Sequence, residues 1–240
     1  MRRAVVDVGS NSVLLLVAEL RRGCWHPIAE TSEVTALGEG VTRTGRLSDE
    51  AVERTLAAVG RAFRTAREAG CSQIVAAATM AVRIASNASD FLAAAAAQST
   101  PVQVISGDEE AQLGLLAVAS DPLFDSPSVS VVDVGGHSTE VSSTSGPRAS
   151  YPVGTLGLRA LLDDAERLDP ENILAASREV DASFAGLAPA EHGSTVVAIG
   201  ATATNLASIR ERLERWDPDA VHGAYLECEE VSRAVGWLCA

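Results

Sequence analysis

Short apolar runs separated by small polar turns predict paired strands at two places in the chain. The first segment, AVVDVGSNSVLLLV, begins at Ala4, and the second, SVVDVGGHSTEVSS, begins at Ser130. Each contains an apolar run, the sequence Asp-Val-Gly, a polar turn and a returning segment, which predicts two strands joined by a tight turn. Because both copies keep this order, the sequence predicts a duplication and two similar lobes.

Helix and strand patterns alternate between and after these copies. Ser48 is a suitable N-cap for a helix over about 49–69, with an apolar face from Val52 to Phe63 and Gly70 at its end. The other expected elements are strands at 73–78 and 102–106, helices through 93–97 and 108–119, a strand and a helix start within 149–162, and a helix from Pro170 to about Gly186.

A further turn follows an apolar strand near the end of the chain. The strand begins at about Val196, the turn lies at Gly200, and Thr202 and Thr204 enter a helix whose N-terminus can take an anion. The alternation as a whole predicts an α/β fold with mixed sheets and flanking helices. No GxGxxG sequence opens a helix, which argues against a Rossmann fold.

Composition and charge restrict the class of protein. The 240 residues are 47% hydrophobic and 21% charged, which is typical of a globular protein with a core. The formal net charge of −13 opposes nonspecific binding of nucleic acid and of anionic membranes, so a polyanionic substrate would need metal ions and a local cradle. The interrupted apolar start predicts neither a signal peptide nor a membrane span. The four cysteines lack metal-ligand spacing, which predicts a reduced, cytoplasmic protein without structural zinc.

Both hairpin turns are suited to binding an anion. Glycine lets the backbone fold sharply and leaves no Cβ in the way, while successive N–H groups and hydroxyls can converge on a phosphate. We expect Asp7 and Asp133 to face one another across a cleft between the lobes, so that both hairpins hold one phosphate chain. The alternative is a pair of ordinary hairpins with glycine-serine turns.

Five ordered motifs resemble the exopolyphosphatase and guanosine pentaphosphate phosphohydrolase (Ppx/GppA) family. They are DVGSNS from Asp7, ATMAVR from Ala78, SGDEEA from Ser106, DVGGHSTE from Asp133 and the turn at Gly200. The resemblance extends from Val5 to about Gly223 and implies an actin-like ATPase (ribonuclease H-like) fold with lobes at 1–124 and 125–240. The family's second lobe usually continues further, so we expect an abbreviated second lobe here.

The resemblance implies a Mg²⁺-dependent phosphohydrolase that releases terminal phosphate from polyphosphate or pppGpp. Glu110 matches the family's catalytic base, Asp133 and Glu140 match its metal-binding carboxylates, and Asp7 is a further candidate ligand for Mg²⁺. The matches to phosphate-binding positions are Gly9, Ser10, Asn11, Ser12, Thr79, Arg83, Gly135, Gly136, His137, Ser138, Thr139, Gly200, Thr202 and Thr204.

Simpler roles compete for three of these residues. Glu110 could be a solvated glutamate in a first helical turn, and Arg83 could form a surface ion pair. His137 stands where the family has glycine, and it is either a turn residue tolerated at positive φ or a phosphate contact.

Other departures weaken the expected phosphate binding. Leu14 and Gly157 stand where the family has cationic residues, and Met80, Ala201 and Asn205 also depart from its motifs. Each missing cation removes a charge-assisted contact worth about 1.5 to 3 kcal/mol.

Two other functions therefore remain in competition with the phosphohydrolase. One is a catalytically weak phosphate or nucleotide sensor, and the other is an actin-like ATPase or sugar kinase, because the superfold is shared. SGDEEA and Glu140 argue against the second. The apolar end around Trp237 leaves a homodimer open.

Overall fold

The computed structural model describes residues 1–146, 148–162, 170–190, 193–231 and 233. Their packing forms two compact units, Met1–Gly107 and Asp108–Ala240. The division falls before the boundary expected after residue 124, because the helix that begins at Gly107 packs into the second unit. The apolar residues around Trp237 lie outside the described residues.

The first unit contains a five-stranded mixed sheet in the order β3-β2-β1-β4-β5. Its strands are β1 (Arg2–Val8), β2 (Ser12–Arg21), β3 (Cys24–Val34), β4 (Gln73–Ala78) and β5 (Gln103–Val104). Strand β1 runs antiparallel to β2 and parallel to β4, as the first repeated segment predicts for its hairpin. Strand β5 is shorter than the expected strand over 102–106, because its partner β4 ends at Ala78.

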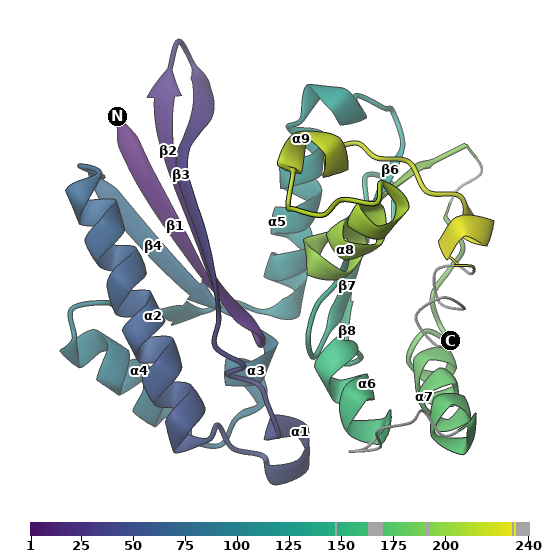
Figure 1. Cartoon of the computed structure of the whole chain (residues 1–240), viewed down its shortest axis with the longest axis horizontal. Helices are drawn as coiled ribbons and strands as arrows, with labels where there is room; N and C mark the ends of the chain where they lie inside the picture. Colours follow the sequence, from purple (N-terminus) through teal and green to yellow (C-terminus); the bar gives the residue numbers. More distant parts are fainter. Residues whose placement is uncertain (147, 163–169, 191–192, 232, 234–240) are drawn as a thin grey trace. The chain divides into compact units, whose positions relative to one another are not determined.

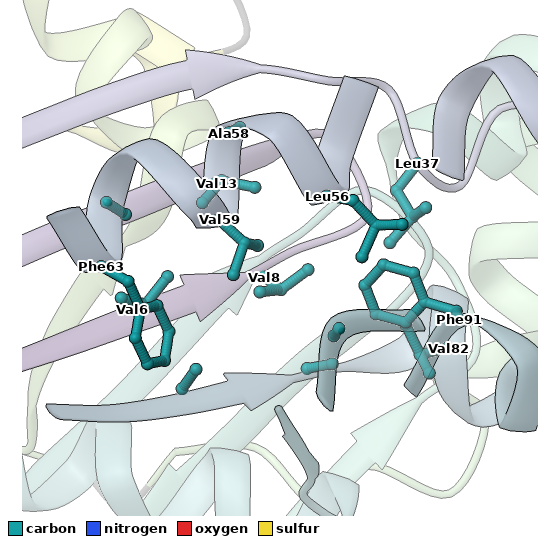
Figure 2. Close-up of a cluster of buried hydrophobic side chains, with 14 of the residues drawn as sticks. Val6, Val8, Val13, Leu37, Leu56, Ala58, Val59, Phe63, Val82 and Phe91 are labelled. Carbon is teal, nitrogen blue, oxygen red and sulfur yellow. The ribbon is translucent and has the colours of Figure 1, made fainter. Parts of the chain in front are cut away.

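Four helices complete the first unit: α1 (Val41–Thr44), α2 (Asp49–Glu68), α3 (Met80–Ile84) and α4 (Ala88–Ala97). The expected N-cap of α2 is confirmed, since the Ser48 side chain accepts from the Ala51 amide. Figure 2 shows valines of β1 and β2 packed against Leu56, Val59 and Phe63 of α2. This apolar contact holds α2 firmly against one face of the sheet.

The second unit has a four-stranded mixed sheet in the order β8-β7-β6-β9. Its strands are β6 (Val129–Val134), β7 (Thr139–Ser143), β8 (Ala149–Tyr151) and β9 (Thr195–Ile199). The α-helices, labelled in Figure 1, are α5 (Gly107–Ala119), α6 (Thr155–Leu162), α7 (Pro170–Ser183), α8 (Gly200–Arg210) and α9 (Pro218–Val221). A 3₁₀ turn, η1 (Pro122–Phe124), follows α5. Helix α5 belongs here because Leu115 and Val118 pack in a core with strands β6 and β9.

The two sheets share one topology, which confirms the α/β fold and the duplication expected from the sequence. In each sheet an antiparallel hairpin, β1-β2 or β6-β7, continues to a third strand on one side. On the other side a parallel strand, β4 or β9, pairs with the first strand of the hairpin. Among the described residues, no helix is both long enough and apolar enough to cross a membrane.

Candidate functional site

The loop between β1 and β2 is a tight turn whose carbonyl groups are bound on one side. The Gly9 amide donates to the Ser12 carbonyl at 2.9 Å. The Ser10 carbonyl accepts from the Gly38 amide at 2.8 Å, and the Asn11 carbonyl accepts from the amides of Thr35 and Ala36 at 2.9 Å each. The segment after β3 therefore holds this loop through its carbonyl oxygens.

The loop between β6 and β7 has the same turn bond, and its bound carbonyls lie one position earlier than those of the first loop. The Gly135 amide donates to the Ser138 carbonyl at 2.9 Å. The carbonyls of Gly135 and Gly136 accept from the first amides of α6, those of Thr155 at 3.0 Å and Leu156 at 2.7 Å. A Cβ at Gly154 would lie 2.6 Å from the carbonyl carbon of Gly136, so this close contact requires glycine.

The bound carbonyls determine where the intervening amides point. In a planar trans peptide the C=O and the following N–H point in opposite directions. The amides of Asn11 and Ser12 in the first loop, and of Gly136 and His137 in the second, therefore point away from the segments that hold the carbonyls. Successive amides turned to one side form a concave site for an anion.

Asp133 and Glu140 lie directly opposite each other on β6 and β7, so both side chains are on one face of the sheet. Glu140 is buried, and one of its carboxylate oxygens accepts from the Ser150 hydroxyl at 2.6 Å. Gly200 has a φ of +82° and begins α8, where any Cβ would overlap the Asp133 carboxylate. The Thr202 hydroxyl donates to the Val134 carbonyl at 2.9 Å, which fixes this turn beside the second loop.

The carboxylate pair fits a magnesium ion. Mg²⁺ takes oxygen ligands and is usually held by one or two carboxylates together with water and substrate phosphates. Asp133 and Glu140 supply two carboxylates on one face, and glycine at position 200 leaves the side of Asp133 without a covering side chain. Across the described parts of the chain, no group of three or more His, Cys, Asp or Glu side chains could hold a metal ion by itself. Phosphate and water would have to complete the coordination.

Asp7 occupies the position in β1 that Asp133 has in β6, but its surroundings differ. Its partner across the hairpin is Leu14, and Ala77 lies beside it on β4. Burial in this apolar environment raises the pKa of the Asp7 carboxyl to about 6. In the protein without ligand, burial therefore disfavours the ionised form of the Asp7 carboxyl.

Glu110 lies in the first turn of α5, and the packing of that helix indicates where it is. Gly114 lies against the Ile199 side chain, and Ile199 is the register partner of Asp133. Glu110 is one helical turn, about 5.4 Å, nearer the N-terminus on the same face as Gly114. Leu115 packs with Val131. Glu110 is thus placed toward the carboxyl ends of β6 and β9, where the second loop begins.

Thr79 and Arg83 lie in the first unit, where β4 leads into α3. The Thr79 amide donates to the Val8 carbonyl at 3.3 Å, next to the first loop. The half-buried Arg83 guanidinium donates to the Ile105 carbonyl at 2.9 Å and lies 3.6 Å from the Met80 sulfur. Arg83 is therefore anchored by the backbone near this loop.

The side chains of the second loop are buried. The Thr139 hydroxyl donates to the Val153 carbonyl at 2.7 Å, which is a structural bond. His137 does not have the positive φ expected of a tolerated turn residue, because the described non-glycine residues with positive φ are Arg22, Ala36, Ser99 and Arg212. Burial lowers the pKa of the His137 imidazole, and its Nδ1 has no hydrogen-bond partner among the described residues.

The sequence did not identify several residues that fix the two loops and the Glu140 carboxylate through hydrogen bonds or close packing. These are Gly154, Ser150 and the turn formed by residues 35–38. The Pro-Val-Gly sequence before α6 was a usable signal for Gly154, since glycine there follows a predicted strand. Ser150 and the turn had no local signal, because their contacts join segments distant in the sequence.

Comparison with known proteins places this geometry in one family. The model of the Ppx/GppA phosphatase family matches residues 16–223. An uncharacterized protein of Streptomyces coelicolor is 32% identical over 254 residues, covering 100% of this chain and 74% of the relative. Exopolyphosphatase 1 of Mycobacterium tuberculosis is 33% identical over 146 residues, covering 60% of this chain and 42% of the relative.

Solved structures agree with the sequence comparison. The Aquifex aeolicus member of the Ppx/GppA family superimposes with a TM-score of 0.79 at 29% identity, covering 99% of this chain and 78% of that protein. An exopolyphosphatase from Cytophaga hutchinsonii gives a TM-score of 0.85, covering 100% of this chain and 80% of that protein. Because only 20% of the residues are identical, this likeness supports the fold alone. This chain therefore belongs to the Ppx/GppA phosphatase family and has its α/β, actin-like fold.

Proposed function

We propose that this chain is a Mg²⁺-dependent phosphohydrolase that releases terminal phosphate from inorganic polyphosphate, from pppGpp, or from both. The observation that carries the proposal is the repeated loop, in which bound carbonyls turn successive amides to one side. Similarity to exopolyphosphatases of Mycobacterium tuberculosis supports polyphosphate as a substrate class. The cytoplasmic location and the homodimer remain predictions.

The backbone supplies the phosphate contacts in this proposal. Amides of Asn11, Ser12, Gly136 and His137 donate to phosphate oxygens, and Arg83 adds a cation near the first loop. Because the carbonyls are already bound, these donors are oriented before the substrate arrives. Such preorganised donors stabilise charge on a transferring phosphoryl group without reorganising at the moment of reaction.

The second unit supplies the groups for the chemical step. Mg²⁺ held by Asp133 and Glu140 would neutralise charge on the phosphate oxygens. Glu110 accepts a proton from the attacking water as its oxygen bonds to the terminal phosphorus. The bond from that phosphorus to the bridging oxygen breaks, and the shortened chain leaves with the bonding pair.

A phosphate sensor is the second candidate, and Leu14 is the observation that favours it. Leu14 lies opposite Asp7 on the hairpin, where a cation would have assisted phosphate binding. Its apolar side chain supplies no positive charge to the partly buried Asp7 carboxyl beside the first loop. A protein with this loop could bind phosphate weakly without efficient turnover.

Phosphate release tests the proposal. Wild-type protein with Mg²⁺ is incubated separately with polyphosphate, pppGpp and ATP. Release from polyphosphate or pppGpp supports the phosphohydrolase, binding without release supports the sensor, and preference for ATP indicates an actin-like ATPase or kinase. The absence of both binding and release would contradict the two leading proposals.

Glu110→Gln tests the assignment of the base in an active protein. We expect kcat to fall on the order of 10²-fold with little change in substrate affinity, because a base is removed while its volume is kept. Glu109→Gln is the matched control, since Glu109 is the exposed neighbour in the same helical turn. Equal turnover by Glu110→Gln and Glu109→Gln would show that Glu110 is not the base.

A further inference from the structure

The turn behind the first loop is strained and is held by several hydrogen bonds. Ala36 has a φ of +50°, in the left-handed region. For a residue with a Cβ, this conformation costs about 1 to 2 kcal/mol. The amides of Thr35 and Ala36 both donate to the Asn11 carbonyl, and the Gly38 amide donates to the Ser10 carbonyl. A strained backbone conformation persists only where neighbouring groups hold it, so the turn needs further contacts on the side that faces away from the loop.

Arg54 provides that support from α2. Its Nε and Nη2 donate to the Thr35 carbonyl at 3.2 and 3.1 Å. Helix α2 is packed into the core of the first unit by Leu56 and Val59, as Figure 2 shows. The guanidinium thus connects the turn to a rigid part of the fold. In the second unit the corresponding support comes directly from the first turn of α6.

These bonds form a continuous line of dipoles from the guanidinium to the loop. The Thr35 carbonyl, which Arg54 binds, belongs to the same peptide as the Ala36 amide, which donates to Asn11. The Asn11 carbonyl in turn belongs to the same peptide as the Ser12 amide. A positive charge at one end polarises each peptide and strengthens the next donor. The Ser12 amide at the far end is one of the amides turned away from this support.

We infer that Arg54 is a positioning residue for the anion-binding loop at Gly9–Ser12. It fixes the turn at Thr35 and Ala36 and increases the strength of the Ser12 amide as a donor to phosphate. The inference rests on the proposed phosphate binding by this loop. Arg54 acts through two peptide groups and does not itself contact the substrate.

The test compares Arg54→Met and Arg54→Lys with Arg61→Met. Arg61 lies two turns further along α2 and pairs with Glu33, so Arg61→Met removes an arginine without touching the turn. Tripolyphosphate affinity is measured by calorimetry, and the backbone amides of Ala36 and Ser12 are followed by NMR in the protein without ligand. Arg54→Lys keeps the charge with a single ammonium group and remains usable if Arg54→Met unfolds.

We expect Arg54→Met to weaken tripolyphosphate binding by about 5- to 10-fold, Arg54→Lys by about 2- to 3-fold, and Arg61→Met by less than about twofold. The Ala36 and Ser12 amide resonances should move in the Arg54 variants and remain in place in Arg61→Met. If wild type binds no tripolyphosphate, the proposed function fails, and the amide resonances still test the relay. Unmoved Ala36 and Ser12 resonances, or equal affinities for Arg54→Met and Arg61→Met, would overturn the inference.

Discussion

The hairpins β1-β2 and β6-β7 have the same backbone plan and different side-chain chemistry. In each, the glycine after the first strand donates to a serine carbonyl at 2.9 Å, and neighbouring carbonyls are bound from behind. Across the first hairpin Asp7 pairs with Leu14, whereas across the second Asp133 pairs with Glu140. Under the proposed function both turns bind phosphate, and the second hairpin places two carboxylates opposite each other, whereas the first places one carboxyl opposite a leucine.

The difference also explains why the two aspartates are not equivalent. Asp7 lies among apolar neighbours, and burial raises its pKa to about 6. Asp133 lies beside a second carboxylate and against the glycine that begins α8. A divalent cation can compensate the carboxylate pair, while burial of a single carboxyl beside leucine favours its protonated form.

The largest expected effect separates the two aspartates. Asp133→Asn should lower kcat/KM by about 10³-fold, because metal stabilisation of transferred charge contributes several kcal/mol. Asp7→Asn should lower kcat/KM by about 10-fold or less, since the loss of one hydrogen bond made by a charged carboxylate costs about 1.5 kcal/mol. Phosphate release over a range of Mg²⁺ concentrations measures both. Equal losses, with equal shifts in the Mg²⁺ requirement, would show that the hairpins share the metal.

Replacing Leu14 by arginine is expected to increase the affinity of the first hairpin for polyphosphate. Leu14→Arg should increase polyphosphate affinity by up to about 1.5 to 3 kcal/mol if the guanidinium reaches a phosphate. Titrations at fixed ionic strength, with and without Mg²⁺, measure the change. Unchanged affinity together with a lowered Asp7 pKa would mean that the new cation pairs with Asp7. Tight binding by wild type without Mg²⁺ would contradict the predicted shortage of cations.

The contact between the second loop and α6 should tolerate no side chain. Gly154→Ala places a Cβ 2.6 Å from the His137 amide nitrogen, and we expect a loss of about 1 to 3 kcal/mol in the free energy of unfolding. Gly157→Ala is the matched control in α6, where a Cβ meets nothing within 4 Å, and it should stabilise by up to about 1 kcal/mol. Urea unfolding measures both variants. Equal free energies of unfolding for Gly154→Ala and Gly157→Ala would show that the second loop shifts to accommodate the added Cβ at little cost.

A further effect, confined to a narrow pH range, is the pH dependence that Asp7 adds to the free energy of unfolding. Its pKa is about 6 in the folded protein and near 3.8 in the unfolded chain, so the folded state binds more protons between these values. Asp7 should therefore remove roughly 1 to 3 kcal/mol of stability as pH rises from about 4 to about 6. Urea unfolding with a chelator, in wild type and Asp7→Asn, measures the difference. Parallel pH profiles would mean that the Asp7 pKa is not raised.

Local patterns were sufficient to predict most of the fold and the positions of the loops. The Ser48 cap, the apolar face of α2 and the repeated Asp-Val-Gly segments carry their structural signal within a few residues. The sequence did not reveal Arg54 or Ser150, because their contacts depend on how distant segments pack. Of the two roles considered for His137, the turn residue at positive φ is excluded, because His137 is not among the described non-glycine residues with positive φ.

The most direct test of two anion-binding loops is an NMR titration of the intact protein with tripolyphosphate and Mg²⁺. We predict that the amides of Asn11 and Ser12 in the first loop, and those of Gly136 and His137 in the second loop, shift on addition of tripolyphosphate. Movement confined to the N-terminus of α8, or no movement of the first loop at saturation, would contradict the claim that both loops bind phosphate.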